Sequence, residues 1–307
     1  MSIEKVLELY GIGKKKIEKH SESEERAVWT INDMYILKES KSKNAIDKNI
    51  KITNMLIQHK IPVQNNLKSL AGQDYIEYNS KYYALYEKIK GHTITDYFYG
   101  DYEKQAYYIG QCIGRLHVGL KDIYDETDND EIDDSNMINE VNGWAHSEIQ
   151  DFLAQGTVSD CETAEFSKLL RYISSDFAEL YNMLPRQIIH RDMHGENMIF
   201  EESNFKGFID FDLSQINARI YDPCYMCTAA LSTVFDKEEI TKWPLFAYQI
   251  VKGYDDIIQL TDIEKQSIKP MMILNEIIMT AFFYKYGYQE IAHTNLKMAL
   301  YINKVIK

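Results

Sequence analysis

The sequence contains few of the features that build a disulfide-stabilised or membrane-spanning protein. Only four of its 307 residues are cysteines, which is too few for a disulfide framework. No apolar run approaches the length of about 18 residues that a membrane helix needs. The opening segment, MSIEKVLELYGIGKKK, is amphipathic and includes acids, unlike a signal peptide. We therefore expect a cytoplasmic protein without a membrane partner.

Two of the cysteines, Cys224 and Cys227, form a CxxC motif, which in other proteins binds zinc or carries out redox chemistry. No second pair lies at zinc-ligand spacing, and no βαβ pattern precedes the motif. Residues three apart on a helix share one face, so both thiols are expected in the core.

Basic residues are also scarce. The chain has 34 Lys and Arg residues against 47 Asp and Glu residues, a formal net charge of −13. Nucleic acids and anionic membranes are bound through basic surfaces, so neither partner is expected. An acidic surface favours solubility and can also attract a cationic substrate.

The first 90 residues have the pattern of short strands around one helix. Strands are predicted at 15–19, 26–32 and 34–40, with a tight turn at Asn32-Asp33 between the last two. Apolar spacing predicts a helix over 43–60. The segments DYIEYN and KYYALYEKI then predict a hairpin that turns at Asn79-Ser80.

The pattern changes after Gly91. Long helices are predicted over 101–123 and 161–184, and the acid-rich segment 125–136 is predicted to be a solvated loop. The segment 205–213 predicts one more strand, and the remainder is helical.

The length of the chain also favours two lobes over one core. We predict an α+β fold with a small β-rich N-terminal lobe, residues 1–90, and a larger, mostly helical C-terminal lobe, residues 91–307. The connection between them is expected at about 86–91. Nothing resembling a coiled coil is present, so a monomer or weak dimer is expected.

A polar cluster lies between short apolar segments in IIHRDMHGENMIF, residues 188–200. Buried charges must be paired, hydrogen-bonded or bound to a cation. We interpret the apolar flanks as strands, and a third strand leads into Asp210. Asp192, Asn197 and Asp210 would then emerge from neighbouring strand ends.

The spacing of these residues points to phosphoryl transfer. Asn197 lies five positions after Asp192, and Asp210 lies 13 positions after Asn197, which is the order of a kinase catalytic loop and a metal-binding Asp. Mg²⁺ prefers oxygen ligands such as those of Asn197 and Asp210. Asp192 is placed to orient a hydroxyl and accept its proton. Each motif alone is common, but the combination is far more specific.

Upstream residues fit a nucleotide, ATP or GTP. Lys38, at the end of an apolar strand, matches the lysine that holds phosphates in kinases. The backbones of Glu87 and Ile89 are expected at the adenine edge. No glycine-rich loop is present, so Ser21, Ser23 and nearby amides are expected to cover the phosphates.

Together these segments resemble the aminoglycoside phosphotransferase and choline kinase-like family, which has a protein-kinase-like fold. The resemblance covers almost the whole chain and is carried by YILK (35–38), YALYEKIKG (83–91), IGRLH (113–117), IIHRDMHGENMIF (188–200) and GFIDFDLSQINARIYDPCYM (207–226). It implies ATP- or GTP-dependent phosphorylation of a small-molecule hydroxyl, with Mg²⁺. In this family an acidic residue also follows the metal-binding Asp, as Asp212 follows Asp210 here. Asp222, in YDP, resembles the family's Asp at the start of the next helix, and we interpret it as structural.

Two features depart from the family pattern. The helix over 43–60 has no Glu to pair with Lys38, and Asp47, its only acid, is the candidate substitute. Arg191 and His194 replace small or apolar residues, and His194 is expected either to support the loop or to touch the substrate.

Several classes of molecule fit as the acceptor of the phosphoryl group. The acidic balance suits a cationic aminoglycoside-type antibiotic, and hence antibiotic resistance. A choline, homoserine or methylthioribose kinase is the alternative, and a catalytically weak spore-coat-associated relative is another. A protein kinase is disfavoured because IDFD replaces DFG and no A-P-E segment follows.

Overall fold

The computed structural model describes residues 3–13, 16–22, 26–126 and 132–306. The chain divides into two compact units. The first, here called the sheet unit, comprises Met1–Ile94, Asp122–Ile132 and Glu196–Ser214. The second, the helical unit, comprises Thr95–Lys121, Asp133–Gly195 and Gln215–Lys307. The expected N-terminal lobe thus gains two later segments, one of which contains Asn197 and Asp210.

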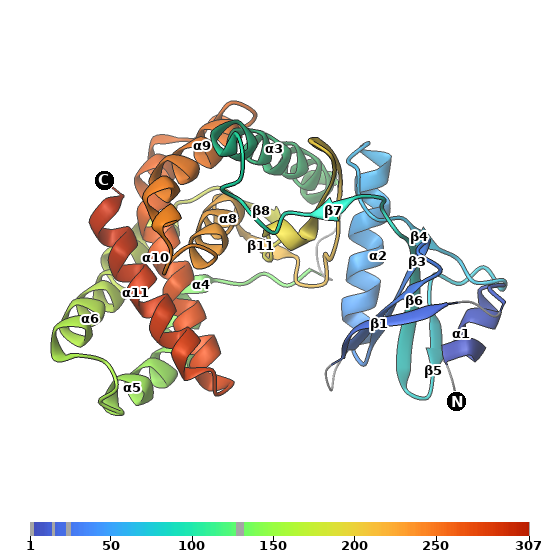
Figure 1. The fold of residues 1–307 in the computed structure, drawn as a ribbon, viewed down its shortest axis with the longest axis horizontal. Coiled ribbons are helices and arrows are strands. Elements are labelled where there is room, and N and C mark those ends of the chain that lie inside the picture. Colours follow the sequence, from blue (N-terminus) through green and yellow to red (C-terminus); the bar gives the residue numbers. More distant parts are fainter. Residues whose placement is uncertain (1–2, 14–15, 23–25, 127–131, 307) are drawn as a thin grey trace. The chain divides into compact units, whose positions relative to one another are not determined.

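The main sheet of the sheet unit is antiparallel, with strand order β1-β2-β3-β6-β4 and β5 paired to β6 (Figure 1). Its strands are β1 (Ile17–Glu22), β2 (Arg26–Ile31), β3 (Tyr35–Ser40), β4 (Asn66–Leu67), β5 (Ile76–Tyr78) and β6 (Lys81–Glu87). The turns between β2 and β3 and between β5 and β6 have positive φ angles at both central residues, as tight hairpin turns require. These residues are Asn32, Asp33, Asn79 and Ser80. Both predicted turns are confirmed.

Helix α2 (Lys43–Gln58) covers one face of this sheet. It begins at Ser42, whose hydroxyl accepts a hydrogen bond from the Ala45 N–H at 3.2 Å. Its apolar residues Ile46 and Ile50 pack against Ala84 and Tyr86 of β6. Ala84 is opposite Lys38 in the β3–β6 register. The α2 face of the sheet is therefore the face that carries Lys38.

The opposite face of the sheet forms a second apolar core. Trp29, Leu37 and Leu85 pack there with residues of α1 (Ile3–Leu9). Side chains alternate along a strand, so Leu37 and Lys38 point to opposite faces. Lys38 therefore lies on the α2 face of the sheet, and the α1 core packs on the other face.

A second, smaller sheet of the sheet unit has strand order β10-β9-β7, with β7 (His92–Thr93), β9 (Met198–Glu201) and β10 (Asn204–Phe208). Gly91 precedes β7 with φ +135°, and a Cβ atom there would lie 2.3 Å from the Phe200 carbonyl oxygen. Only glycine fits this approach of the chain to β9.

The helical unit is built around helix α10 (Asp262–Lys285), which packs against α5, α6, α7, α8 and α11 (Figure 1). The other elements that lie wholly or partly in this unit are α3 (Tyr102–Glu126), α4 (Met137–Glu140), η1 (Val141–Ala145), α5 (His146–Ala154), α6 (Asp160–Ser174), α7 (Asp176–Tyr181), β8 (Arg186–Ile189), η2 (Gly195–Asn197), β11 (Gln215–Ala218), α8 (Tyr221–Ser232), η3 (Glu238–Lys242), α9 (Trp243–Asp255) and α11 (Gln289–Val305). The last residues of α3 and of η2 belong to the sheet unit. No helix in the described part of the chain is both long enough and apolar enough to cross a bilayer.

The single helix predicted over 161–184 is wrong in one respect, because the chain breaks between α6 and α7. Ser175 leaves the helical conformation, with φ −119° and ψ −77°. Its N–H, at 3.0 Å, and its hydroxyl, at 2.8 Å, both donate hydrogen bonds to the Arg171 carbonyl oxygen and complete the last turn of α6.

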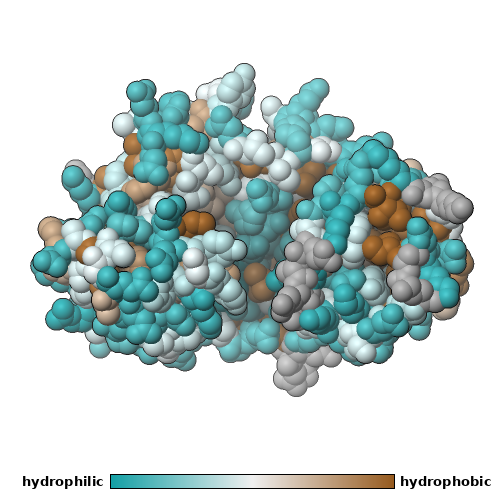
Figure 2. All heavy atoms as spheres, turned by 60° about the horizontal axis from the view of Figure 1, so that its bottom comes forward, coloured by the Kyte–Doolittle hydropathy of each residue, from teal (hydrophilic) through white to brown (hydrophobic). Residues whose placement is uncertain are grey.

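The surface is mainly polar. Hydrophilic residues cover most of the face drawn in Figure 2. The acidic segment 125–136 falls partly outside the described residues.

Candidate functional site

In the sheet unit, Lys38 lies among acidic side chains. Its Nζ atom is 2.8 Å from Oδ1 of Asp210 and 3.9 Å from Oδ1 of Asp212. Only 11% of the Lys38 side chain is exposed. This arrangement unites three residues that the sequence analysis had assigned to one site.

The hairpin of β9 and β10 brings Asn197 and Asp210 together. Met198 pairs with Phe208, so Asn197 and Ile209 lie at the same end of the hairpin. The Ile209 N–H donates a hydrogen bond to the Asn197 carbonyl oxygen at 3.1 Å. Asp210 follows with φ +68°, an uncommon conformation for this residue type. An amide and a carboxylate, both suitable Mg²⁺ ligands, are therefore neighbours.

The charges in this group are interdependent. Burial disfavours the charged form of Lys38, but Asp212 and Asp210 outweigh burial and raise the pKa of the lysine. Burial raises the pKa of Asp212, and the like charge of Asp210 adds to this rise while Lys38 opposes it. Lys38 is therefore a stable cation beside two acids.

Helix α2 contributes an amide to this group. The Asn49 side chain donates a hydrogen bond to Oδ1 of Asp212. Asp47 instead forms an ion pair with Lys43, with Nζ and Oδ2 3.4 Å apart, and 46% of its side chain is exposed. Two residues correspond to about 200° around a helix, so Asp47 and Asn49 face different directions. In the described part of the chain, Lys38 forms its ion pairs with Asp210 and Asp212, and the suggested substitution by Asp47 does not occur.

In the helical unit, the loop before Asp192 is held by Asp222. The N–H groups of His190 and Arg191 donate hydrogen bonds to its two carboxylate oxygens at 2.8 and 2.9 Å. Nε2 of His117 lies 2.8 Å from the same carboxylate, and Nδ1 lies 2.8 Å from the Tyr254 hydroxyl. Asp222 thus supports the loop, as expected, and the histidine of IGRLH supports Asp222.

Arg191 fixes the loop from its other side. It has φ +70°, and Nη2 contacts both carboxylate oxygens of Glu140 at 3.0 Å. Its Nη1 atom donates a hydrogen bond to Oε1 of Gln215 at 3.0 Å. The unexpected arginine is therefore a structural residue that secures the backbone next to Asp192.

His194 also belongs to this loop. Its N–H donates a hydrogen bond to the Asp192 carbonyl oxygen at 3.1 Å, and Nε2 lies 3.4 Å from Oδ2 of Asp192. The next residue, Gly195, donates its N–H to the Tyr97 hydroxyl at 2.7 Å. These contacts favour loop support by His194, one of the two roles expected for it.

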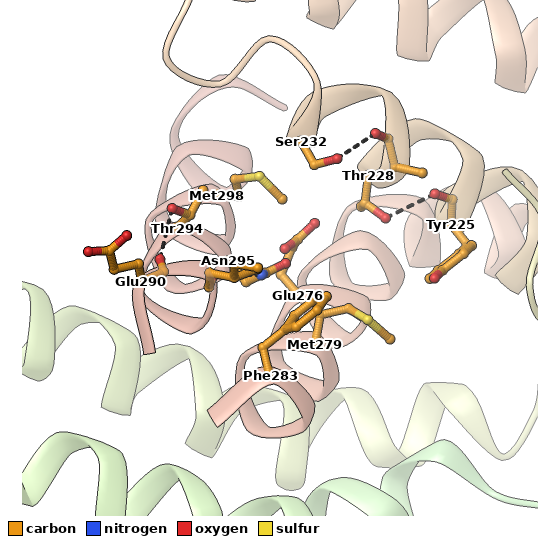
Figure 3. A pocket seen from close by; sticks show the side chains of 12 residues that line it. Tyr225, Thr228, Ser232, Glu276, Met279, Phe283, Glu290, Thr294, Asn295 and Met298 are labelled. Atoms are coloured by element: carbon orange, nitrogen blue, oxygen red, sulfur yellow. Dashed lines mark hydrogen bonds between the residues drawn. The ribbon is translucent and has the colours of Figure 1, made fainter. Parts of the chain in front are cut away.

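A cavity of about 450 Å³ lies beside Asp192, between helices α8, α10 and α11 (Figure 3). Tyr225 of α8 lines this cavity, and its hydroxyl donates a hydrogen bond to the Asp192 carboxylate. Burial raises the pKa of Tyr225 well above its ordinary value, and the nearby acids Asp192 and Glu276 raise it further. Tyr225 therefore stays protonated. Its side chain lines the cavity and contacts Asp192, the expected base.

A family model decides the identity of the chain. The model of the phosphotransferase enzyme family matches residues 17–255, well over half of the sequence. The chain belongs to the phosphotransferase enzyme family.

Two curated relatives of this phosphotransferase are homoserine kinases. The chain is 30% identical to that of Gluconobacter oxydans over 106 residues, 34% of this chain and 32% of the relative. It is 24% identical to that of Zymomonas mobilis over 214 residues, 70% of this chain and 61% of the relative. The matches thus span about a third and about three-fifths of the curated relatives.

Solved structures of similar fold include three small-molecule kinases. The complex of amicoumacin kinase with AMP-PNP, Ca²⁺ and Ami has a TM-score of 0.69 and 16% identity, and the match covers 93% of this chain and 88% of that one. The GDP and kanamycin complex of APH(2")-IIia has a TM-score of 0.72 and 12% identity, over 98% of both chains. A microcompartment-associated aminopropanol kinase has a TM-score of 0.69 and 13% identity, over 98% and 96%. The predicted protein-kinase-like fold is confirmed.

Not every residue expected to touch the nucleotide is free to do so. The Glu87 N–H donates a hydrogen bond to the Asn65 carbonyl oxygen at 2.9 Å, and the Glu87 carbonyl oxygen accepts one from Nε2 of Gln64 at 3.2 Å. An adenine could therefore use only the second lone pair of that carbonyl oxygen. Ile89 follows the end of β6, and Ser21 lies exposed on β1. Ser23 lies outside the described residues.

One expected strand arrangement needs correction. Strand β8, which leads to Asp192, pairs with β11 and not with β9. Asp192 therefore belongs to the helical unit, whereas Asn197 and Asp210 belong to the sheet unit. Strand pairing depends on contacts remote in sequence, which the local apolar pattern does not contain.

The CxxC cysteines are structural, as expected. Cys224 and Cys227 are fully buried in α8, and burial raises the pKa of both thiols. Within the described ranges, no cluster of three or more His, Cys, Asp or Glu side chains is arranged to hold a metal.

Sequence reasoning missed Asn49, Glu140, Tyr225 and Glu276. For Glu276 a signal existed, because it is an acid inside the apolar segment MMILNEIIM. The same argument that singled out residues 188–200 applies to this acid: a charge between apolar residues needs a partner.

Proposed function

We propose that this phosphotransferase transfers the γ-phosphoryl group of ATP or GTP to a hydroxyl of a small, cationic molecule. The observation that carries the proposal is the grouping of Lys38, Asn197 and Asp210 in the sheet unit, with Nζ of Lys38 2.8 Å from Asp210. Asp192 precedes this metal-binding pair in the order typical of kinases. We expect the enzyme to act in the cytoplasm, as a monomer or weak dimer.

The sheet unit would hold the nucleotide. Lys38 would bind phosphate oxygens, the carbonyl of Glu87 and the backbone of Ile89 would meet the base, and Ser21 would lie toward the phosphates. Asn197 and Asp210 fit Mg²⁺ because both offer hard oxygen ligands. When bound, Mg²⁺ would neutralise the charge of the phosphates. The similar structures hold AMP-PNP with Ca²⁺ in one case and GDP in another, which supports a nucleotide of either kind.

The helical unit would activate the acceptor. Asp192 would orient the hydroxyl group and accept its proton as the oxygen attacks phosphorus. Tyr225 and His194 both contact the Asp192 carboxylate and would limit its rotation. Asp222, His117 and Arg191 would hold the loop backbone behind it.

The first acceptor class to test is an aminoglycoside-type antibiotic. Its amino groups suit the net charge of −13, and one structure of similar fold contains kanamycin. A role in antibiotic resistance would follow.

A metabolite kinase is the second candidate. Both curated relatives are homoserine kinases, and another structure of similar fold is an aminopropanol kinase. Choline and methylthioribose belong to the same class of acceptors. The contacts around Asp192, Asn197 and Asp210 argue against a catalytically weak relative.

Coupled-enzyme release of ADP or GDP, measured with Mg²⁺ across a panel of acceptors, tests the proposal. The panel comprises kanamycin, spectinomycin, choline, homoserine, methylthioribose and 1-amino-2-propanol. Asp192→Asn is expected to lower kcat by about 10²–10⁴-fold and to leave nucleotide binding unchanged. A folded protein that binds neither nucleotide would contradict the proposal.

A further inference from the structure

Glu276 is an acidic residue in the middle of the apolar helix α10 and lines the cavity beside Asp192. Only 1% of the residue is exposed, and nothing in the described part of the chain donates a hydrogen bond to Oε2. Figure 3 shows its carboxyl group projecting into the cavity, with Asn295 on one side and Thr228 on the other. A buried carboxyl group without a donor is costly, so a ligand that supplies one would bind favourably.

Most donors of the other polar side chains in the cavity are already used by the protein. The hydroxyls of Thr228, Ser232 and Thr294 donate hydrogen bonds to carbonyl oxygens of their own helices at 2.8–3.0 Å. The Asn295 amide uses one of its two N–H donors on the Ile291 carbonyl oxygen at 2.7 Å. Hydroxyl oxygens that donate to the backbone can still accept hydrogen bonds. The cavity is therefore rich in acceptors and poor in donors.

The charge of the lining has one sign. Glu276 and Glu290 are its acidic residues, and among the residues that the structure describes no Lys, Arg or His lines the cavity. The rest of the lining is apolar or neutral, including Met279, Phe283 and Met298. A ligand carboxylate would find no cationic partner here, whereas a primary ammonium group brings three donors and no acceptor.

The cavity is also linked to the expected base. Tyr225 lines it and donates its hydroxyl hydrogen to Asp192, and Glu276 is close enough to raise the pKa of Tyr225. A molecule with its amine at Glu276 would extend along Tyr225 toward Asp192. An amine and a hydroxyl on one small molecule match these two ends.

We propose that this cavity is the acceptor site and that Glu276 binds a primary ammonium group of the acceptor. The acceptor class is then an amino alcohol or amino sugar that has no carboxylate. This inference rests on the proposed phosphotransfer to a cationic alcohol and narrows its choice of substrate. It favours compounds such as 1-amino-2-propanol and kanamycin over homoserine, which carries a carboxylate, and over choline, which has no N–H donor.

The protonation of Glu276 is consistent with this role. Burial raises the pKa of its carboxyl group well above the ordinary value. An opposite charge nearby favours the ionised form of a carboxyl group. Binding of an ammonium group therefore favours the ionised form of Glu276, and the two charges form an ion pair.

The test measures kcat and KM for phosphorylation of 1-amino-2-propanol, kanamycin, choline and homoserine by the full chain. Glu276→Gln keeps the size of the side chain and removes its charge. The matched control is Asp262→Asn, which removes one exposed acid from the first turn of the same helix. Calorimetric titration of the same four compounds, and separately of ATP and GTP, measures binding without turnover.

1-Amino-2-propanol and kanamycin, the two amines without a carboxylate, are expected to have kcat/KM values at least about tenfold above those of homoserine and choline. Glu276→Gln should raise their KM, and weaken their binding, by about 10–100-fold with a smaller change in kcat. Asp262→Asn should change neither by more than about threefold. Homoserine as the best acceptor, or unchanged amine binding in Glu276→Gln, would overturn the inference.

The titrations separate this inference from the proposed function. If the wild-type chain binds ATP or GTP but none of the amines, the Glu276 inference fails and nucleotide-dependent chemistry stands. If the amines bind through Glu276 but neither nucleotide binds, the proposed function fails and the amine site stands. The comparison of wild-type acceptors decides the matter even if Glu276→Gln does not fold.

Discussion

Nε2 of His117 lies 2.8 Å from Oδ2 of Asp222, and neither side chain is exposed. Asp222 in turn accepts the N–H groups of His190 and Arg191. A buried imidazole and a buried carboxylate thus hold the backbone from which Asp192 projects. The fold of the helical unit and the position of the expected base depend on the same two side chains.

Replacing Asp222 with Asn should therefore harm both stability and activity. The amide turns an NH₂ group toward backbone donors and leaves at least one buried N–H unpaired. We expect the free energy of unfolding to fall by about 2–4 kcal/mol and kcat to fall by at least about tenfold. Urea denaturation and steady-state kinetics measure the two effects. The exposed control Asp236→Asn should change stability by less than about 0.5 kcal/mol.

Lys38→Gln should weaken nucleotide binding and also destabilise the sheet unit. The change removes the proposed phosphate ligand and leaves Asp210 and Asp212 without their cation. We expect the nucleotide Kd to rise by about 10–100-fold and the unfolding free energy to fall by about 1–3 kcal/mol. Millimolar Mg²⁺ should recover more of the melting temperature in the variant than in the wild type, as measured by thermal denaturation. Equal recovery in both proteins would argue against a metal site at Asp210.

Gly110→Ala should destabilise the helical unit although alanine favours helices. A Cβ atom at Gly110 in α3 would lie 2.1 Å from the Ile250 carbonyl oxygen in α9. Backbone atoms cannot rotate away, so the two helices must separate, at a cost of about 1–3 kcal/mol. Thermal denaturation measures the loss. Gly13→Ala serves as control, since no atom lies within 4 Å of the added carbon; an equal loss there would contradict the packing argument.

Tyr86→Phe is expected to keep or raise stability. The Tyr86 hydroxyl is buried, and within the described ranges it has no hydrogen-bond partner. Removing an unpaired buried hydroxyl recovers part of a desolvation cost of about 1–3 kcal/mol. Denaturant titration of the nucleotide-free protein measures this gain. A loss above about 1 kcal/mol would show that the hydroxyl has a partner after all.

The ion pair of Glu264 and Arg219 predicts a pH effect. Burial alone would raise the pKa of Glu264, but the hydrogen bonds from Arg219 and Thr261 outweigh it and lower that pKa. Its contribution to stability is therefore full above the unfolded-state pKa of about 4.3 and is lost as the pH falls through the lower folded-state value. The stability difference between wild type and Glu264→Gln should shrink as the pH falls from about 5 to about 3. A difference that is constant with pH would contradict the shift.

Local patterns in the sequence were sufficient for much of the fold. The β2–β3 and β5–β6 hairpins were predicted from alternating residues and turn residues, and α2 was predicted from its apolar spacing. Asn197 and Asp210 were found because their order and spacing along the chain are characteristic. The pairing of β8 with β11 was missed because it depends on residues 26 to 32 positions apart in sequence, Ile189 with Gln215 and Arg186 with Ala218.

The residues that complete the site were harder to predict. Asn49 contacts Asp212 only because the fold brings α2 to the segment that follows β10, and a single asparagine in a helix carries no signal of this contact. Glu276 was detectable as an acid in an apolar helix, but its neighbours Tyr225 and Asn295 come from two other helices. Contacts of this kind arise from packing and not from local sequence pattern.

The β9–β10 hairpin also explains the distance in sequence between Asn197 and Asp210. Their 13 positions are the length of a path out along β9 and back along β10, and the chain reverses just after Glu201. Residues added at that reversal would lengthen the excursion without moving either end. The separation of the two proposed metal ligands is therefore free to vary among enzymes with the same chemistry. A search for such enzymes should treat this interval as a hairpin of variable length and not as a fixed count.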